Sequence, residues 1–315
     1  MKRHNSLILT THSGADPDGM GAEIVLAQIF RAKGKYVRIV NGAPTPKRYS
    51  FMDPDGEIEF WENIKEDIPS KAALVIIDTS DEYNIGPVKE FIPHALEVFV
   101  IDHHEPSPFC TFEGYTDNTA SSVCEMAVEI ASAEGVSLNR KSANAAYTGI
   151  IYDSGSFAYS KTTIRTFKAA LSLIEAGVIP YDMYHELQET GSISAILLQK
   201  LVLSSLQIYN EGRVAVQIMR KEDLKLSDAL YEDGEYFINI PLKAKNIEVS
   251  VMVKENKEGE IRCSLRSKGK VNVSKIAQSF GGGGHVAAAG FKGRESIEET
   301  LEKTLEKIAS SLEKT

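Results

Sequence analysis

The sequence has few cysteines, three in 315 residues, and no long hydrophobic run. Cys110, Cys124 and Cys263 are scattered and odd in number, which argues against a disulfide framework and against a paired-cysteine zinc site. No apolar run approaches the ~20 residues that span a bilayer. The apolar stretch at residues 7–11 is too short for an export signal, and acidic residues follow it at once. We therefore expect a cytoplasmic protein with no membrane partner.

The sequence also lacks an excess of positive charge, because its formal net charge is −9. Affinity for long duplex nucleic acid depends on many phosphate contacts, so this balance disfavours such a partner. A small phosphorylated ligand held by a local basic patch remains compatible with it. Hydrophobic residues make up 43% and charged residues 25%, which is typical of a globular protein, and the length is sufficient for two domains.

The first half of the chain alternates buried-strand patterns with a helical pattern. Residues 73–78 and 97–102 are almost continuously apolar, as in parallel strands covered on both faces. Between the expected strands 7–12 and 36–41, residues 19–34 carry apolar side chains at helical spacing and stop at a glycine. The pattern predicts an α/β fold: an N-terminal doubly wound, mainly parallel sheet with helices on both faces.

The second half changes character after residue 212. We expect a first domain at 1–190, a connecting helix at 191–210, and a smaller α+β domain at 211–315. The expected strands of that second domain have β-branched or alternating residues and lie at 213–220, 235–242, 247–256 and 260–269. A helix precedes a run of four glycines, and a final amphipathic helix covers 296–314.

Acidic residues and histidines gather at the ends of the expected strands and helices of the first half. Parallel strands carry their carboxyl ends to one edge of the sheet, where ligands of open α/β sheets bind. Carboxylates crowded there would repel one another strongly, and divalent cations would remove the conflict. The residues concerned are His12, Asp16, Asp18, Asp78, Asp102, His103, His104 and Asp153.

The ligand types suit particular metals. Neutral imidazole with carboxylate oxygen suits Mn²⁺, and also Co²⁺, Fe²⁺ or Zn²⁺, whereas Ca²⁺ prefers cages made only of oxygen. Each motif alone is weak: the DPDG at residues 53–56 reads as a plain turn, and a lone strand-end aspartate is usually a cap or turn residue. Several such motifs in one domain favour a site for two divalent ions, with Mn²⁺ preferred.

With these motifs assembled, the chain resembles the DHH phosphoesterase superfamily, which is named for the triplet at residues 102–104. HSGADPD, DTSD and the later Asp153 match in order, and RSKGKVNVSKIAQSFGGGGHVAAAGF resembles the DHH-associated domain. The resemblance covers nearly the whole chain. Within the superfamily, length and composition point to the compact group of nanoRNase and pAp phosphatases.

The resemblance implies a role for each site residue. His12, Asp16 and Asp78 would bind a first metal ion. Asp18, Asp78, His103 and Asp153 would bind a second, so that Asp78 bridges the two. His104 would act at the reacting phosphate, and Asp102 would orient an imidazole or serve as a weaker ligand.

The resemblance also implies a substrate-binding role for the second domain. Consecutive glycines let backbone N–H groups approach an anion, and an arginine can bind phosphate through two hydrogen bonds. A flexible glycine loop and a merely solvated basic run are the alternative interpretations. The expected substrate-binding residues are Arg266, Ser267, Gly281, Gly282, Gly283, Gly284 and His285.

The function that follows is hydrolysis of short oligoribonucleotides, dinucleotides or pAp to mononucleotides, by attack of a hydroxide that bridges two metal ions. An exopolyphosphatase or pyrophosphatase is an alternative, since it shares the metal site. A catalytically silent nucleotide-binding regulator is another, although the intact set of acids and histidines argues against it. The sequence leaves the oligomeric state open, with a homodimer as one possibility.

Overall fold

The structure is a computed structural model that describes residues 3–69, 71–105, 110–284 and 286–312. The chain forms two compact units, Met1–Thr190 and Gly191–Thr315. Within the described residues, no helix combines the length and the apolar character needed to cross a membrane.

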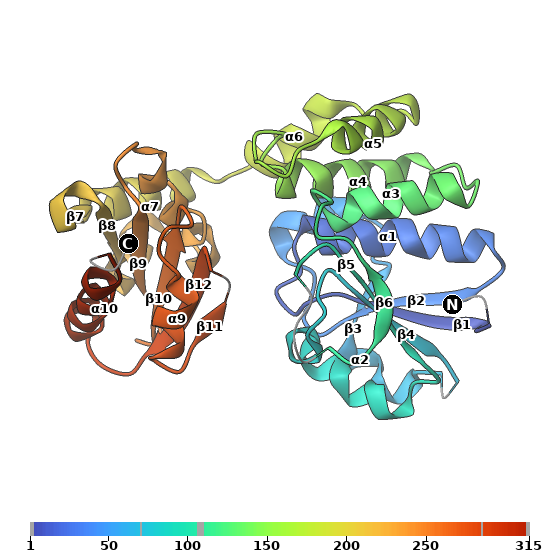
Figure 1. Ribbon diagram of the computed structural model, residues 1–315, viewed down its shortest axis with the longest axis horizontal. Helices are drawn as coiled ribbons and strands as arrows, with labels where there is room; N and C mark the ends of the chain where they lie inside the picture. Colours follow the sequence, from blue (N-terminus) through green and yellow to red (C-terminus); the bar gives the residue numbers. More distant parts are fainter. Residues whose placement is uncertain (1–2, 70, 106–109, 285, 313–315) are drawn as a thin grey trace. The chain divides into compact units, whose positions relative to one another are not determined.

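The first unit is built on a six-stranded sheet in the order β3-β2-β1-β4-β5-β6, and every neighbouring pair is parallel (Figure 1). This confirms the expected parallel sheet. The order reverses between β1 and β4, the point at which open α/β sheets bind ligands. The strands are β1 (Ser6–Thr10), β2 (Tyr36–Asn41), β3 (Ile58–Phe60), β4 (Ala73–Ile77), β5 (Val98–Asp102) and β6 (Glu113–Thr116).

Helices cover both faces of this sheet. On one face α1 packs against α3 and α4, and α5 and α6 lie outside them against α4 (Figure 1). The approach of α1 to α4 requires Gly21, since a Cβ there would lie 2.6 Å from the carbonyl oxygen of Ala145. The other face buries Trp61, Leu74 and Phe91 in a second core. The elements are α1 (Pro17–Ala32), α2 (Trp61–Ile64), α3 (Val123–Ala133), α4 (Arg140–Asp153), α5 (Ile164–Glu175), α6 (Pro180–Gln188) and the 3-10 segments η1 (Lys47–Met52), η2 (Lys65–Asp67) and η3 (Glu82–His94).

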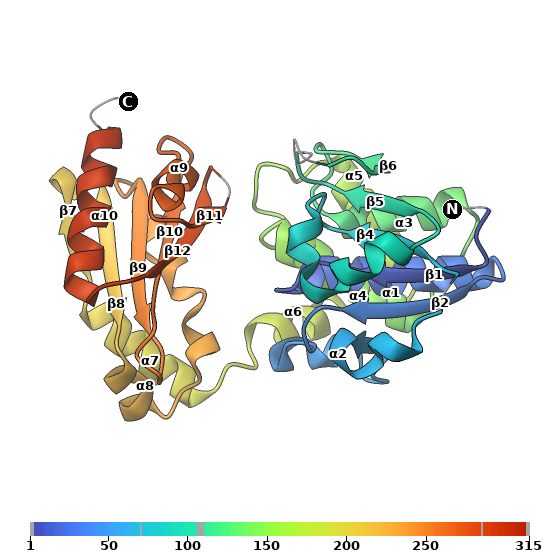
Figure 2. The ribbon, with the colours of Figure 1, turned by 90° about the horizontal axis from the view of Figure 1, so that it is seen from below.

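The second unit has its own six-stranded sheet, in the order β11-β12-β10-β9-β8-β7, with β8 and β9 parallel and the other pairs antiparallel. Helices α9 and α10 pack on the core at one face, and Figure 2 shows α10 running along the strands. The strands are β7 (Gln207–Tyr209), β8 (Val214–Met219), β9 (Val249–Glu255), β10 (Ile261–Ser267), β11 (Gly283–Gly284) and β12 (Ala288–Gly293). The helices are α7 (Ile193–Ser204), α8 (Lys221–Ser227), α9 (Val273–Gln278), α10 (Ile297–Leu312) and the 3-10 segments η4 (Asn210–Gly212), η5 (Tyr231–Gly234), η6 (Phe237–Asn239) and η7 (Pro241–Lys243).

Two expectations about the second half are wrong. The connecting helix expected at 191–210 ends at Ser204 as α7, and Leu198 and Val202 of that helix are buried with Met219 and Met252 of the second sheet. Two of the apolar side chains of this helix are therefore core contacts of the second unit. The strand expected at 235–242 is instead the pair of 3-10 turns η6 and η7, with proline at the start of η7, where it would interrupt a strand ladder.

Five strands escaped prediction: β7, β11 and β12 in the second unit, and two short strands, β3 and β6, in the first. β3 has three residues and β6 has four, and both lie at sheet edges, where few apolar residues mark a strand. The turn expected at 53–56 is present, since the Asp53 carboxylate accepts hydrogen bonds from the backbone N–H groups of Glu57 and Ile58. β3 and β6 could not be recognised in the sequence because they are short and lie at the edges of the sheet.

Candidate metal centre

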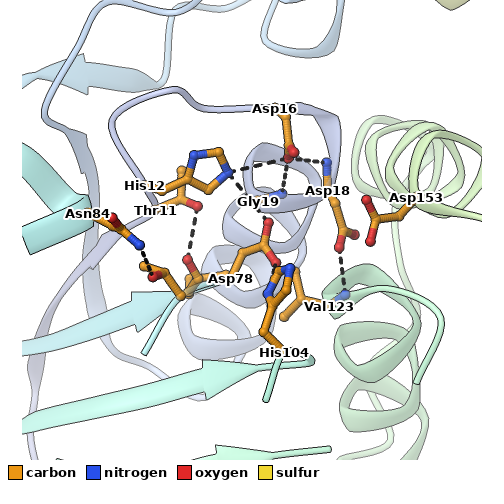
Figure 3. A network of polar contacts seen from close by, with 12 residues as sticks. Thr11, His12, Asp16, Asp18, Gly19, Asp78, Asn84, His104, Val123 and Asp153 are labelled. Atoms are coloured by element: carbon orange, nitrogen blue, oxygen red, sulfur yellow. Dashed lines mark hydrogen bonds and ion pairs between the residues drawn. The ribbon is translucent and has the colours of Figure 1, made fainter. Parts of the chain in front are cut away.

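Three loops meet at the carboxyl edge of the first sheet, at the point where the strand order reverses (Figure 3). His12 follows β1 by two residues, Asp78 follows β4 directly, and His103 follows β5 directly. Parallel pairing of β1, β4 and β5 brings these loops side by side. The sheet therefore gathers residues that are up to about 90 positions apart in sequence, as the strand-end pattern predicts.

Asp78 lies at the middle of the arrangement. Its Oδ2 is 3.7 Å from His12 Nε2, while its Oδ1 is 3.4 Å from His103 Nε2 and 3.6 Å from His104 Nδ1. The backbone of Asp78 has φ 64°, a left-handed conformation that is uncommon outside glycine and costs free energy unless the surroundings hold it. The two oxygens face different imidazoles, which is the arrangement that a bridging carboxylate needs.

A first group of ligand atoms comes from His12, Asp16 and Asp78, all within 4.8 Å of one another. Asp16 is also the N-cap of α1, where its Oδ1 accepts hydrogen bonds from the N–H groups of Asp18 and Gly19 at 3.1 Å each. The cap fixes the carboxylate, and Asp16 Oδ1 lies 3.7 Å from His12 Nε2. Helix formation by α1 thus positions one candidate ligand.

A second group comes from Asp18, His103 and Asp153. His103 Nε2 is 3.1 Å from Asp153 Oδ2 and 3.6 Å from Asp18 Oδ2. Both Asp18 oxygens accept hydrogen bonds from the first N–H groups of α3, those of Val123 at 2.7 Å and Cys124 at 2.9 Å. The unpaired amides and the positive end of the helix dipole stabilise the buried charge of Asp18 and hold its side chain still.

Burial and mutual charge shift the pKa values of the groups at this centre. Burial, together with the charges of Asp78 and Asp153, raises the pKa of Asp18 well above its usual range. Burial lowers the pKa of His103, but its ion pairs with Asp153 and Asp78 outweigh that effect and raise the pKa to about 11. In the same way, the carboxylates of Asp16 and Asp78 overcome the burial of His12 and raise its pKa to about 10. Without metal, protons on carboxylates and imidazoles would offset the charge.

Three buried polar atoms at the centre bear on whether a metal fits, and Asp102 Oδ2 is one of them. The other two, Asp78 Oδ1 and His103 Nε2, likewise make no hydrogen bond to any described residue. Unpaired buried polar atoms are costly and call for a partner. A divalent cation that accepts carboxylate oxygen and imidazole nitrogen would satisfy both atoms and replace the protons, so the residues fit the cofactor that the sequence predicts.

His104 and Asp102 form a pair beside the two groups. His104 Nδ1 is 2.8 Å from Asp102 Oδ1, and the same oxygen accepts a hydrogen bond from the His104 backbone N–H at 3.0 Å. A third group of residues that could hold a metal ion consists of Asp78, His103 and His104. Asp102 is fully buried and belongs to none of the three groups found among the described residues. This geometry favours the orienting role of Asp102 over the weaker-ligand role.

The expected substrate-binding residues lie in the second unit. Arg266 is on β10, where its Nη1 donates to the carbonyl oxygen of Leu265 at 3.1 Å. The Ser267 hydroxyl is buried, donates to the Val271 carbonyl at 2.7 Å and accepts from the Gly269 N–H at 2.9 Å. Ser267 therefore holds the turn after β10, a structural role that the sequence did not suggest.

The glycine run is partly used by the fold itself. The N–H of Gly281 donates to the Gln278 carbonyl and that of Gly282 to the Ala277 carbonyl, which closes α9. Gly282 also passes so close to β12 that a Cβ there would lie 2.2 Å from the Gly290 carbonyl oxygen. These two amides are committed to the fold, while Gly283 and Gly284 form β11. His285, the last residue of the expected phosphate loop, lies outside the described residues.

A polar network behind the first metal group was not found from the sequence. Asn41, at the end of β2, donates through Nδ2 to Glu23 Oε2 at 3.0 Å and accepts through Oδ1 from the Thr11 N–H at 3.1 Å. Glu23 is buried, and burial raises its pKa to about 8. Because Thr11 precedes His12, the network supports the loop that carries a candidate ligand. The signal was a lone acidic residue in an otherwise apolar stretch of α1.

Comparisons with known proteins agree with this architecture. The DHH family, N-terminal domain, matches residues 6–150, and the DHHA1 domain matches residues 233–314. The bifunctional oligoribonuclease and PAP phosphatase NrnA of Thermus thermophilus is 27% identical, over 97% of this chain and 90% of that protein. The protein of the same description from Bacillus subtilis is 26% identical, over 91% of this chain and 89% of that protein.

A solved structure is similar over the same extent. An exopolyphosphatase-related protein from Bacteroides fragilis superimposes with a TM-score of 0.89 at 25% identity, and the match covers 99% of this chain and 93% of the other. A superposition of this extent includes the elements of both units, β1 to α10.

Proposed function

The chain belongs to the DHH family, and from this premise we propose that it is a metal-dependent phosphoesterase acting on short oligoribonucleotides, dinucleotides or pAp. One observation carries the proposal: Asp78 lies between His12, His103 and His104 at the reversal point of a parallel sheet, with each oxygen toward a different imidazole. Relatives that span about nine tenths of this chain or more are described as oligoribonucleases and PAP phosphatases, which supports the same substrate class here.

The proposed cofactor is a pair of divalent cations. His12, Asp16 and Asp78 would hold one, and Asp18, Asp78, His103 and Asp153 the other. We propose Mn²⁺ because the ligand set mixes carboxylate oxygen with imidazole nitrogen and contains no thiolate. When bound, the ions would supply Lewis acidity that promotes deprotonation of water and offsets charge on phosphoryl oxygens.

His104 is proposed as the residue that acts on the leaving group. Its Nδ1 is engaged with Asp102, and Nε2 is the ring nitrogen proposed to give a proton to the leaving oxygen. The carboxylate beside Nδ1 fixes the ring orientation. His104 is also the more exposed of the two strand-end histidines, with 40% of its side chain accessible against 3% for His103, so a substrate can reach it.

The second unit is proposed to hold a phosphate of the substrate. Arg266 supplies a guanidinium, and the backbone of Gly283 and Gly284 allows close approach of an anion. His285 is retained in this proposal as a further contact. The net charge of −9 favours ligands with few phosphates over long nucleic acid. A cytoplasmic location, the absence of a membrane partner and a homodimeric state are also proposals.

An exopolyphosphatase is the second candidate function, because the solved structure with the TM-score of 0.89 is described as exopolyphosphatase-related. Such an enzyme would need the same metal centre but no contact with a base. A silent regulator is less well supported, since two groups of residues, His12 with Asp16 and Asp78, and Asp18 with His103 and Asp153, could each hold a metal ion. Activity against polyphosphate compared with activity against nucleotides separates the first two alternatives.

The test is hydrolysis of 5′-phosphorylated dinucleotides, pAp, cyclic dinucleotides and polyphosphate by the full chain with Mn²⁺, compared with the Asp78→Asn variant. We expect the wild type to prefer the nucleotides and Asp78→Asn to lose about 100-fold or more in kcat/KM, with fewer bound ions by elemental analysis. Asparagine keeps the size of the side chain and tolerates the left-handed backbone, so the change removes mainly charge.

Asp228→Asn is the matched control, because Asp228 is an exposed aspartate with φ 56° that lies in the second unit. It should keep full activity and full metal content. If Asp78→Asn retained both the rate and the metal stoichiometry, the bridging role would be excluded. No turnover of any substrate by the manganese-loaded wild type would contradict the proposed activity.

A further inference from the structure

Arg165, in the first turn of α5, lies among three carboxylates that belong to other elements of the first unit. Its Nε and Nη2 donate to the two oxygens of Glu129 at 2.8 and 2.7 Å, which makes a bidentate pair. Its Nη1 donates to Asp117 Oδ2 at 2.8 Å, and its Nε lies 3.3 Å from Glu125 Oε1. One guanidinium therefore joins α5 to α3 and to the residues that follow β6.

Residues 117–122, between β6 and α3, connect this guanidinium to the metal centre. We call them the 117–122 segment. The segment begins with a turn that Asp117 closes: its Oδ1 accepts from the Thr119 N–H at 3.0 Å, and its carbonyl oxygen accepts from the Ala120 N–H at 3.1 Å. Because Arg165 holds the other oxygen of the same carboxylate, it fixes the turn that positions Ala120.

Ala120 in turn faces the ring of His103. Its carbonyl oxygen lies 3.5 Å from His103 Nδ1, a long hydrogen bond in which the carbonyl can only accept. The contact therefore favours the neutral ring with its proton on Nδ1 and its lone pair on Nε2. Nε2 is the atom that lies near Asp18 and Asp153 in the second metal group, so the Ala120 carbonyl orients a candidate ligand.

Arg165 also reaches Asp18, by way of Glu125. Glu125 is fully buried, and its Oε2 accepts hydrogen bonds from the hydroxyls of Ser121 at 2.7 Å and Thr166 at 2.6 Å. Its Oε1 makes no hydrogen bond to a described residue and faces the guanidinium. These contacts fix the first turn of α3, whose first two amides bind the Asp18 carboxylate, one of them drawn in Figure 3.

We propose that Arg165 is a positioning residue of the second metal group, acting on His103 through the 117–122 segment and on Asp18 through the start of α3. The proposal rests on the metal centre of the proposed function. None of the contacts of Arg165 with described residues is with a candidate ligand. Arginine suits the role because its planar fork donates in several fixed directions at once, whereas lysine offers a compact charge on a flexible stem.

The test is a calorimetric titration of the full chain with Mn²⁺, comparing the wild type with Arg165→Met. We expect about 10-fold weaker binding of one of the two ions, since loss of an outer partner of a metal ligand typically weakens binding by about 10–100-fold. The other ion, assigned to His12, Asp16 and Asp78, should bind nearly as in the wild type. Wild-type affinity for both ions in a folded Arg165→Met would overturn the proposal.

Arg38→Met is the matched control for a general loss of stability. Arg38 is half-buried like Arg165 and also makes a bidentate pair, with the two oxygens of Glu59 at 2.7 and 2.5 Å. It pairs with Ile8 in the middle of β1, away from the carboxyl edge of the sheet. Urea denaturation should show a lower midpoint for both variants, whereas only Arg165→Met should bind manganese more weakly. Equal loss of affinity in the two variants would show that Arg165 serves the fold alone.

A double variant separates position from stability even if Arg165→Met folds poorly. Arg165→Met leaves the buried Glu125 without its cation, and Glu125→Gln in the same chain removes that unpaired charge at nearly constant size. We expect the double variant to regain most of the urea midpoint but to keep the weak binding of one ion, because Asp117 still lacks its partner. If affinity returned together with stability, the positioning role would be wrong.

The readout is metal affinity, so it stands apart from turnover. Selective loss of one ion in Arg165→Met supports the positioning role even if the wild type hydrolyses none of the nucleotides, a result that would contradict only the proposed activity. Conversely, a wild type that hydrolyses the nucleotides, with unchanged affinity in Arg165→Met, would overturn the positioning role alone.

Discussion

At the scale of single residues, Asp78 combines an unusual backbone conformation, a buried oxygen without a hydrogen bond to any described residue, and contacts with three histidines. Burial raises the pKa of Asp78, but its contacts with His103 and His12 outweigh burial and hold the pKa far below the usual value. The residue is thus kept ionised where a cation would need it.

Asn41 offers a residue-scale prediction outside the ligand set. Asn41→Ala would remove the donor to Glu23 and the acceptor for the Thr11 N–H, leaving buried polar groups unpaired. We expect a loss of about 1–3 kcal/mol in the free energy of unfolding. We also expect about 10-fold weaker manganese binding, because Thr11 precedes the candidate ligand His12. Urea denaturation and calorimetric titration measure the two quantities.

Asn63→Ala is the control for this change, since Asn63 is exposed on α2. Manganese affinity and stability equal to wild type in Asn41→Ala would rule out a supporting role for the network. If Asn41→Ala lost the predicted free energy of unfolding but bound manganese as tightly as the wild type, the network would serve the fold alone.

At the scale of elements, α7 belongs to the core of the second unit rather than to a free connection. Leu198→Ala should therefore destabilise that unit by about 2–5 kcal/mol, since it removes a fully buried leucine packed with Val202, Met219 and Leu224. Hydrogen exchange of β8 and β9 checks this, because those strands should lose protection. Ile196→Ala, on the exposed side of the same helix, should have little effect.

If Leu198→Ala and Ile196→Ala altered protection equally little, α7 would act as a connecting helix outside the core, which is closer to the prediction from the sequence. The error in that expectation has a clear origin. α7 is apolar around much of its circumference, since Leu197 and Ile193 are exposed while Leu198 and Val202 are buried, so the pattern did not show which face would be covered.

At the scale of the whole molecule, the candidate ligands all belong to one unit. Metal binding should therefore stabilise the two units unequally. The chain has one tryptophan, Trp61, buried in the first unit, so its fluorescence reports on that unit alone. We expect Mn²⁺ at about 100 times its dissociation constant to stabilise the first unit by about 2.7 kcal/mol. This should raise the unfolding temperature recorded by Trp61.

Hydrogen exchange of β9 and β10 in the second unit should change little on addition of the same metal. In the Asp78→Asn variant the shift in Trp61 fluorescence should largely disappear. An equal gain in protection across both units, or a shift that survives Asp78→Asn, would argue against a metal centre confined to the first unit.

Much of the first unit could be predicted from the chain because its signals are local. The buried strand at Ala73–Ile77 is uniformly apolar, and Asp16 with Pro17 marks the start of α1. The edge strands β3 and β6 could not be predicted, because they are short and carry few apolar residues. The turns at 237–243 could not be predicted either, because Phe237 and Ile238 are buried through contacts with distant segments. The glycine run was recognised, but two of its amides close α9, which the residue types do not reveal.

By itself the sequence indicated which residues are candidate ligands: His12, Asp16, Asp18, Asp78, His103, His104 and Asp153 stand near the ends of strands and helices, and strand direction predicts that those after parallel strands meet at one edge. Only the tertiary structure decided which of these side chains contact one another and which backbone groups bind them. It placed Asp78 between three imidazoles, gave Asp18 the amides of α3, and joined Asp102 to His104. The reason is that these contacts depend on the pairing of segments far apart in sequence, which composition and periodicity do not encode.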